Sequence, residues 1–368
     1  MTLAGTRIEA APAADRVVAL WIGPVAKAWI VSRALIAAGL LIGTRLRTGR
    51  LTGRGFVAWD GQWYLRTAVS GYGAAPAAGR QSPWPFFPLL PTLLRVFHAM
   101  QLPAGAVMIV ANHLLIGVAL VGVWHLAGRH FDAAVATRSV WIVALFPMSG
   151  VFSMLYPSAI FLAASVWAFE LAERRRWALS GVAACVAAIA RPNGALVATV
   201  LLAVVLASEN GTRRRHAVIA VAGPAFVAVA VWMGICAFKT GDPFVFVTAK
   251  AAWHEQTVVS LVRHLAAPHL DSMVVHVGFG LAAAIALAAT WTHLPRSWRA
   301  LAVISITVPL ASGLVGLGRY TIECFPFAIA GGAVLARVPR HLVLATGVLS
   351  ACAALAVTAA IAGHGLVP

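Results

Sequence analysis

The chain is organised around the stretch Trp59-Asp60-Gly61-Gln62-Trp63-Tyr64, which follows the first long apolar segment. Asp60 is one of only 11 acidic residues in a protein that carries 28 Lys and Arg. Aromatic faces pack against sugar rings, and a carboxylate can accept a proton from a hydroxyl group. A cluster of Trp and Tyr is equally typical of the aromatic belt at a membrane interface. The stretch therefore indicates either a sugar-handling site or an interfacial anchor.

The composition indicates a polytopic all-α membrane protein. Of 368 residues, 61% are hydrophobic and 11% are charged, and the mean hydropathy is +0.87. Soluble domains carry about 25% charged residues. The apolar residues form about eleven blocks of a length that crosses hydrocarbon as a helix. The predicted spans are 24–43, 104–126, 139–155, 157–172, 177–190, 194–207, 217–238, 273–292, 301–317, 321–336 and 341–362.

We expect one integral membrane domain, 1–368, with an N-terminal arm at 1–20 and a second outward connection at 239–272. The first connection, 44–103, is long and contains both the Asp60 stretch and a run with four prolines at 83–91. Proline removes a backbone donor and interrupts helices, so this run predicts a structured segment or short surface helix and not a regular span. The four cysteines and the histidines lack paired or ligand spacing, so neither a disulfide framework nor a metal site is predicted.

The basic loops predict the orientation of the chain. Arginines fall in alternate connections, at 174–176, 213–215, 296–299 and 337–340. Short basic loops stay in the cytoplasm, which makes the N-terminus cytoplasmic and turns the intervening loops outward. The first outward loop is itself basic, but the rule applies poorly to long loops. The net charge of +17 is then explained by topology and anionic lipids, with no need of nucleic acid. We expect the active site at the outer face of a plasma membrane.

Few acids on the outward side can serve as a general base. The candidates are Asp60, Asp242, Glu255, Asp271 and Glu323. Asp242 lies in a Thr-Gly-Asp-Pro sequence, which is typical of a turn or a helix cap. Glu323 follows Arg319 by four residues, the spacing of an ion pair on one helical face. Asp60 is therefore the preferred base.

Cations beside the apolar segments predict an anion site. Arg191 and Arg319 lie at span boundaries, and Lys250 and His254 are four residues apart. Buried cations are costly unless they bind something, and Arg and Lys are both phosphate ligands. For each residue the alternative is that its charge reaches the lipid headgroups. The chain has no Gly-rich phosphate loop after a strand, so a lipid-linked donor is favoured over a nucleotide.

Five short motifs occur in order along the chain. They are Trp59-Asp60-Gly61-Gln62-Trp63-Tyr64-Leu65 through Gly71-Tyr72, Phe86-Phe87-Pro88-Leu89-Leu90-Pro91, Ala190-Arg191-Pro192-Asn193-Gly194, Gly241-Asp242-Pro243-Phe244, and Leu317-Gly318-Arg319-Tyr320 through Phe325-Pro326. With these motifs the sequence resembles the PIG-V-like mannosyltransferases, the family of GPI mannosyltransferase 2 and its bacterial relatives, in the GT-C superfamily. It departs from the family at Tyr156-Pro157-Ser158-Ala159, where a Tyr-Ser-Glu-Ser-like run is usual.

The resemblance implies a GT-C fold and an inverting transfer of mannose from a polyprenyl-phosphate donor to a lipid or glycolipid acceptor, without a metal or other cofactor. Asp60 would be the base, and Arg319, Arg191, Lys250 and His254 would bind the donor phosphate. The residues that would contact sugar or acceptor are Trp59, Gln62, Trp63, Tyr64, Tyr156, Asn193 and Tyr320.

Two other classes of function remain open from the sequence. A transporter or flippase of an anionic (glyco)lipid would line its pathway with the same basic residues. The sequence shows no inverted repeat to support such a transporter. A noncatalytic subunit of an envelope complex would keep its role in assembly without Asp60.

Overall fold

The structure is a computed structural model that describes residues 23–77, 79–253 and 272–368. Within these ranges every regular element is a helix, so the predicted all-α architecture is confirmed. The α-helices are α2 (Pro24–Thr48), α3 (Asp60–Ser70), α4 (Leu89–Ala99), α5 (Ala104–His130), α6 (Ala133–Leu145), α7 (Ser158–Glu173), α8 (Trp177–Ala190), α9 (Ala195–Ser208), α10 (Gly211–Thr240), α11 (Val245–Thr248), α13 (Ser272–Thr290), α14 (Arg296–Ser312), α15 (Leu317–Glu323), α16 (Phe325–Leu335) and α17 (Arg340–Ala362). Short 3-10 helices are η1 (Gly53–Val57), η2 (Pro147–Phe152), η3 (Pro192–Gly194), η4 (Ala249–Trp253) and η5 (Trp291–His293).

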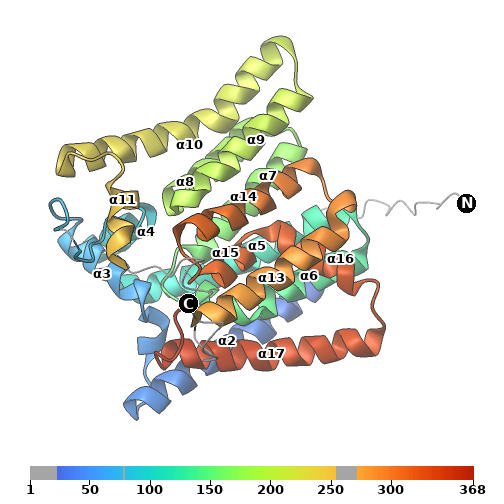
Figure 1. The fold of residues 1–368 in the computed structure, drawn as a ribbon, viewed down its shortest axis with the longest axis horizontal. Coiled ribbons are helices and arrows are strands. Elements are labelled where there is room, and N and C mark those ends of the chain that lie inside the picture. Colours follow the sequence, from blue (N-terminus) through green and yellow to red (C-terminus); the bar gives the residue numbers. More distant parts are fainter. Residues whose placement is uncertain (1–22, 78, 254–271) are drawn as a thin grey trace, which may run out of the picture.

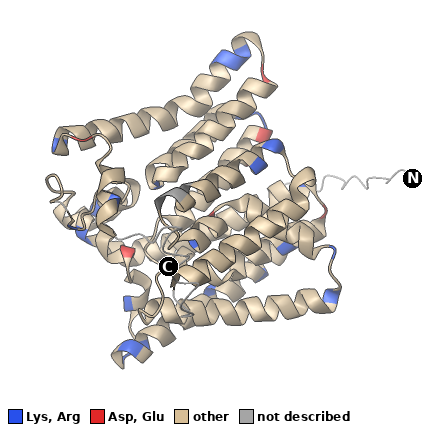
Figure 2. Ribbon diagram, viewed as in Figure 1, with Lys and Arg blue, Asp and Glu red and all other residues tan. Residues whose placement is uncertain are grey.

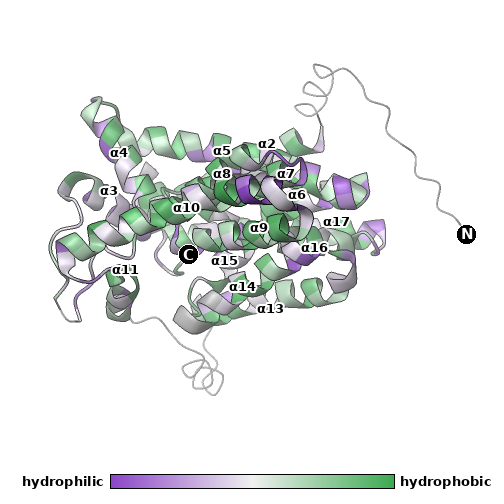
Figure 3. Ribbon diagram, turned by 90° about the horizontal axis from the view of Figure 1, so that it is seen from above, coloured by the Kyte–Doolittle hydropathy of each residue, from purple (hydrophilic) through white to green (hydrophobic). Residues whose placement is uncertain are grey.

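Five of the described helices are long and apolar enough to cross a membrane. They are α2, α5, α10, α13 together with η5, and α17. Shorter apolar helices, among them α6, α8, α9 and α16, complete the bundle. Helices α9 and α10 are hydrophobic along much of their length (Figure 3), and several of their apolar side chains, such as Leu206, Ile219 and Val227, are exposed. Exposed apolar surface of this kind is typical of helices that face lipid. The number of about eleven spans stays a prediction.

Two of the predicted spans are broken at prolines or near them. The predicted span 139–155 is wrong as a single helix, because α6 ends at Leu145 and η2 begins at Pro147. Proline disfavours helical geometry in the residue before it, here Phe146. The predicted span 321–336 is likewise divided at Cys324 into α15 and α16. The Pro-rich run 83–91 ends where α4 begins, and the connection 44–103 holds two separate short helices, α3 and α4.

The helices pack around a centre formed by α5, α6, α7, α8 and α16, and α7 is buried along nearly its whole length. The two apolar helices α2 and α17 lie side by side (Figure 1). They approach backbone to backbone, since a Cβ added to Gly43 would lie 2.0 Å from the carbonyl oxygen of Ala359. Glycine permits this close approach because it has no side chain.

The basic loops and the predicted site lie at opposite ends of the bundle. At one end, the buried carboxylate of Glu170 pairs with Arg129 at 2.8 Å and Arg174 at 2.6 Å, and Arg175 pairs with Glu209 at 3.2 Å. Helices α10 and α17 both begin toward this end and run to the end at which α3, α4 and α11 gather (Figures 1 and 2). The structure therefore places the basic connections at one end of the bundle and the predicted site at the other, as the alternation of basic residues predicts. Which end faces outward stays a prediction.

We expect position 66, on α3 beside Asp60, to face outward and position 175 to face the cytoplasm, because short basic loops are retained inside. Single-cysteine variants at these positions need a background without native cysteines, since Cys352 is exposed. An impermeant maleimide applied to intact cells should label position 66, and label position 175 only after lysis. Labelling of position 175 alone in intact cells would reverse the orientation.

Candidate functional site

A strained turn places Asp60 at the first residue of α3. Trp59, which precedes it, has φ 56° and ψ −123°, a conformation that L-residues rarely adopt. Such geometry costs of order 1–3 kcal/mol and persists only where the surroundings hold it. Here the Asp60 backbone N–H donates to the Tyr156 hydroxyl at 3.0 Å. The Trp59 indole N–H donates to the carbonyl of Ile361 at 3.0 Å.

Arg319 on α15 forms an ion pair with Asp60. Its Nη1 lies 3.0 Å from Asp60 Oδ2, although 259 residues separate the two in the chain. The side chains of Arg319 and Asp60 are 14% and 29% exposed, so the pair is largely shielded from solvent. The Arg319 guanidinium also lies 5.6 Å from the ring centroid of Tyr156, a cation–π contact. Tyr156 therefore supports both members of the pair.

A second ion pair joins Arg191, between α8 and η3, to Glu323 at the end of α15. This pair is buried, with side-chain exposures of 7% for Arg191 and 0% for Glu323. The prediction that Glu323 pairs with Arg319 is therefore wrong. Arg319 and Glu323 both lie on α15, but they pair with different partners. Arg319 pairs with Asp60 on α3, and Glu323 pairs with Arg191. The Arg191 guanidinium also lies 4.8 Å from the ring centroid of Tyr320.

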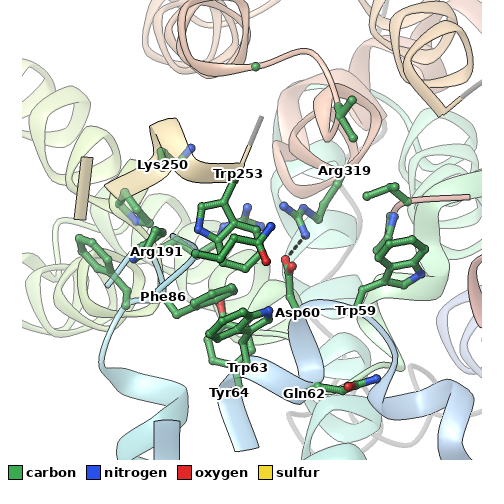
Figure 4. A pocket seen from close by; sticks show the side chains of 18 of the residues that line it. Trp59, Asp60, Gln62, Trp63, Tyr64, Phe86, Arg191, Lys250, Trp253 and Arg319 are labelled. Carbon is green, nitrogen blue, oxygen red and sulfur yellow. Dashed lines mark hydrogen bonds and ion pairs between the residues drawn. The ribbon is translucent and has the colours of Figure 1, made fainter. Parts of the chain in front are cut away.

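These elements surround a cavity of about 600 Å³, shown in Figure 4. Of the residues proposed from the sequence, those that line it are Trp59, Asp60, Gln62, Trp63, Tyr64, Arg191, Lys250, Arg319 and Tyr320. The structure thus brings together most of the predicted site from α3, η4, α15 and the α8–η3 connection. His254, predicted to bind phosphate, lies outside the described residues, as do Glu255 and Asp271.

Aromatic rings form one wall of the cavity. The Trp63 ring packs edge-on against Trp253 with centroids 5.1 Å apart, and it lies nearly parallel to Phe86 at 6.0 Å. Phe86 and Trp253 also meet each other at 5.4 Å. Sequence reasoning assigned no site role to Phe86 or Trp253. Two features of the sequence could have indicated a role in the site. Phe86 begins one of the five motifs, and Trp253 follows Lys250 by three residues.

The end of the chain forms another part of the wall. His364, Val367 and Pro368 line the cavity, and the His364 ring stacks on Trp59 with centroids 4.9 Å apart. The backbone of Val367 is held on both sides: its carbonyl accepts from His276 Nε2 at 2.9 Å, and its N–H donates to the Ser272 hydroxyl at 3.0 Å. No sequence motif marks these residues.

Two of the predicted contact residues lie outside the cavity wall. Tyr156 and Asn193 are buried and do not line the cavity, so direct contact of these two with a sugar does not fit their positions. Gln62 lines the cavity but is exposed, and its side-chain oxygen accepts from Arg66 at 3.3 Å. Burial, followed by the nearby Asp60 charge, raises the pKa of Tyr64 well above its usual range. Its phenol therefore stays neutral and is not a base.

Asp242, another of the candidate bases that the structure describes, has a structural role. One carboxylate oxygen of Asp242 accepts from the backbone N–H of Phe244 at 2.7 Å, and the other accepts from the Thr248 hydroxyl at 2.9 Å. These bonds form a turn that leads into α11, one of the two structures that the Thr-Gly-Asp-Pro sequence predicts. Among the described residues, no group of three or more His, Cys, Asp or Glu is arranged to hold a metal ion.

A scan against protein-family models finds no matching family, and a search of curated proteins finds no match. Solved structures with a similar arrangement of helices include the oligosaccharyltransferase of Archaeoglobus fulgidus in the apo form, at TM-score 0.47 and 14% identity, covering 90% of this chain and 55% of that chain. The same archaeal protein, AglB, in complex with an inhibitory peptide and a dolichol-phosphate gives TM-score 0.46 and 12% identity, covering 91% and 55%. This chain spans about half the length of those structures. The likeness is too distant to assign a function to the cavity.

Proposed function

We propose that this protein is a membrane glycosyltransferase that transfers a sugar from a lipid-linked donor to a hydroxyl acceptor. The observation that carries the proposal is the Asp60–Arg319 pair, at 3.0 Å, in a cavity of about 600 Å³ with Trp59 and Trp63 in its walls. Carboxylates take protons from hydroxyl groups, guanidinium groups bind phosphates, and aromatic rings pack on sugars. All three kinds of group meet here.

The reaction follows from these positions. Asp60 accepts the proton of the acceptor hydroxyl as that oxygen forms a bond to the anomeric carbon of the sugar. The bond from this carbon to the phosphate oxygen breaks, and the lipid phosphate leaves with the electron pair. Attack opposite to the leaving group inverts the anomeric centre, so a β-linked donor yields an α-linked product. The resemblance of the five motifs to those of the PIG-V-like mannosyltransferases favours mannose on a polyprenyl phosphate, a lipid or glycolipid acceptor, and the GT-C fold.

The cations have a specific part in this scheme. The phosphate gains negative charge as it leaves, so a nearby cation stabilises the transition state more than the ground state. Arg319 is the best placed, because it already touches Asp60 and lines the same cavity. When the donor phosphate binds Arg319, the Asp60 carboxylate loses its ion-pair partner. Asp60 is then able to accept the proton of the acceptor hydroxyl. Lys250 lines the same cavity, whereas the charge of Arg191 is balanced by Glu323.

The direct test uses the purified protein in detergent with synthetic polyprenyl-phosphate mannose and a total membrane lipid extract. We expect free polyprenyl phosphate and a mannosylated lipid, both detected by mass spectrometry. Polyprenyl-phosphate glucose in a parallel reaction tests the choice of sugar. If neither donor is consumed, while the protein moves fluorescent anionic lipid across liposomes, the protein is a flippase and the proposal is wrong.

Replacement of Arg319 by Ala is expected to weaken donor binding and turnover together. A charge-assisted hydrogen bond contributes about 1.5–3 kcal/mol, which corresponds to a loss of about tenfold to 100-fold. Donor affinity and single-turnover rates of the purified variant measure the two effects separately. Arg50→Ala, an exposed cation outside the cavity, is the matched control. Unchanged donor affinity in Arg319→Ala would remove Arg319 from the phosphate site.

Transfer is also expected to be independent of divalent metal ions, because Arg319 and Lys250 supply positive charge within the cavity. Activity after exhaustive EDTA treatment should equal that of the untreated enzyme. Loss of activity with EDTA and its recovery with Mg²⁺ or Mn²⁺ would show that these side chains do not suffice.

A further inference from the structure

A second cavity, of about 450 Å³, lies at the other end of α3. It is formed by the end of α3, the loop that follows, helix α4 and the last turns of α10. Its lining residues are Thr67, Ser70, Gly71, Tyr72, Gly73, Trp84, Pro91, Thr92, Arg95, Ile235 and Lys239. None of them lines the Asp60 cavity. The two linings adjoin on α3, where Tyr64 and Thr67 are three residues apart, but the rise of 1.5 Å per residue puts Ser70 about 15 Å from Asp60.

The polar groups of this second cavity suit an anion. Two cations, Arg95 and Lys239, line it together with the hydroxyl groups of Thr67, Ser70 and Thr92, and no lining residue is a carboxylate. The Nε of Arg95 donates to the Ala68 carbonyl at 2.8 Å, which fixes the guanidinium against the end of α3. Its two terminal amino groups have no partner among the described residues, and they remain able to bind a ligand. Guanidinium, ammonium and hydroxyl groups are together typical of phosphate sites.

The aromatic wall of the cavity is rigid and has its own hydrogen bonds satisfied. The Tyr72 hydroxyl donates to the Phe86 carbonyl at 2.7 Å, and the Trp84 indole N–H donates to the Ala74 carbonyl at 3.1 Å. Both rings pack against Trp232 of α10, with centroids 4.9 Å and 6.0 Å away. The Thr67 hydroxyl is also used within the protein, since it donates to the Trp63 carbonyl at 2.7 Å. The polar groups left for a ligand are therefore the two cations and the hydroxyls of Ser70 and Thr92, presented in front of an apolar surface.

The second cavity also lies at the end of the apolar surface of α10. Lys239 is in the last turn of α10, a candidate membrane span, and its neighbour Phe238 is 88% exposed. On the other side, Val96 of α4 and Met100, the residue that follows this helix, are exposed. Cations at the end of an apolar helix beside an amphipathic helix are typical of the headgroup region of a bilayer.

We propose that the second cavity binds the phosphate of an anionic phospholipid headgroup. Lys239 and the terminal amino groups of Arg95 hold the phosphate, and the hydroxyls of Ser70 and Thr92 donate to its oxygens. The acyl chains follow the exposed apolar side chains of α10, such as Ile235 and Phe238. A lipid held in this way ties α10 to α3 and α4. The proposal does not depend on the transferase function, because the bound lipid lies outside the reach of Asp60.

Native mass spectrometry of the full chain in a neutral detergent tests the proposal. The protein is titrated with dioleoyl-phosphatidylglycerol, with zwitterionic dioleoyl-phosphatidylcholine, and with phosphatidylglycerol in the presence of inorganic phosphate. We expect at least about tenfold tighter binding of phosphatidylglycerol than of phosphatidylcholine. Inorganic phosphate at millimolar concentration should compete with the bound phosphatidylglycerol.

Variants then locate the site. Lys239→Gln should lower the affinity for phosphatidylglycerol about tenfold. Arg95→Lys, which keeps the charge but loses the fork of the guanidinium, should lower it less. Arg50→Gln removes an exposed charge from the same end of the bundle and should leave it unchanged. Equal affinity in Lys239→Gln and wild type, with equal melting temperatures, would overturn the proposal. Binding of inorganic phosphate without preference for phosphatidylglycerol would show a free-anion site and would equally refute it.

Discussion

Asp60→Asn is expected to lower the rate of sugar transfer by about 10²- to 10⁴-fold, the usual effect of losing a general base. Asparagine keeps the size of the side chain and an oxygen that can accept a hydrogen bond from Arg319. It cannot accept the proton of an acceptor hydroxyl. The side chains of Arg319 and Asp60 are only 14% and 29% exposed, so Asp60→Asn leaves Arg319 as a mostly buried charge, and the melting temperature of the variant is measured beside its rate.

The measurement is side-by-side kinetics of purified variants in lipid nanodiscs, with donor binding recorded separately. Asp242→Asn is the matched control, because the same change falls on an acid that forms the turn before α11 and does not line the cavity. We expect Asp242→Asn to keep nearly the wild-type rate. A nearly wild-type rate in Asp60→Asn would show that another group takes the proton.

Glu323→Gln is expected to destabilise the protein by about 3–5 kcal/mol, because it leaves Arg191 as an unpaired buried charge. The Arg191 side chain is only 7% exposed, and water reaches it poorly. The matched control is Glu173→Gln, which removes a partly exposed partner of His130. A surface pair of this kind contributes under about 1 kcal/mol.

The double variant Arg191→Met with Glu323→Leu separates loss of the charge pair from loss of packing. Replacing both charges by apolar side chains removes the desolvation cost, so much of the stability should return. Thermal unfolding in a single detergent compares all variants. If Glu323→Gln melts like the wild type, the buried pair has little effect on folding. If the double variant is the least stable of the set, then packing, and not charge balance, is what the two residues supply.

Hydropathy alone predicted the class of fold, because a helix that crosses hydrocarbon needs a long apolar run wherever it lies in the bundle. The boundaries were harder to predict. Proline at 147 ended α6, and α15 and α16 divided at Cys324, although the hydropathy of both predicted spans was continuous. Sequence reasoning also identified Asp60, Arg191, Lys250 and Arg319, since charged residues beside apolar segments are few in this chain.

The partners of these charges were decided by the tertiary structure. Helical spacing predicted that Arg319 pairs with Glu323, but Arg319 pairs with Asp60 and Glu323 pairs with Arg191, across 259 and 132 residues. Helical spacing describes only neighbours on one helix, whereas a partly buried charge pairs with the opposite charge that packing brings nearest. The same applies to Trp253 and the last residues of the chain, which become cavity walls only through packing. The sequence by itself thus determined an all-α membrane fold and the kinds of groups in its site. The packing of distant helices decided which of those groups meet.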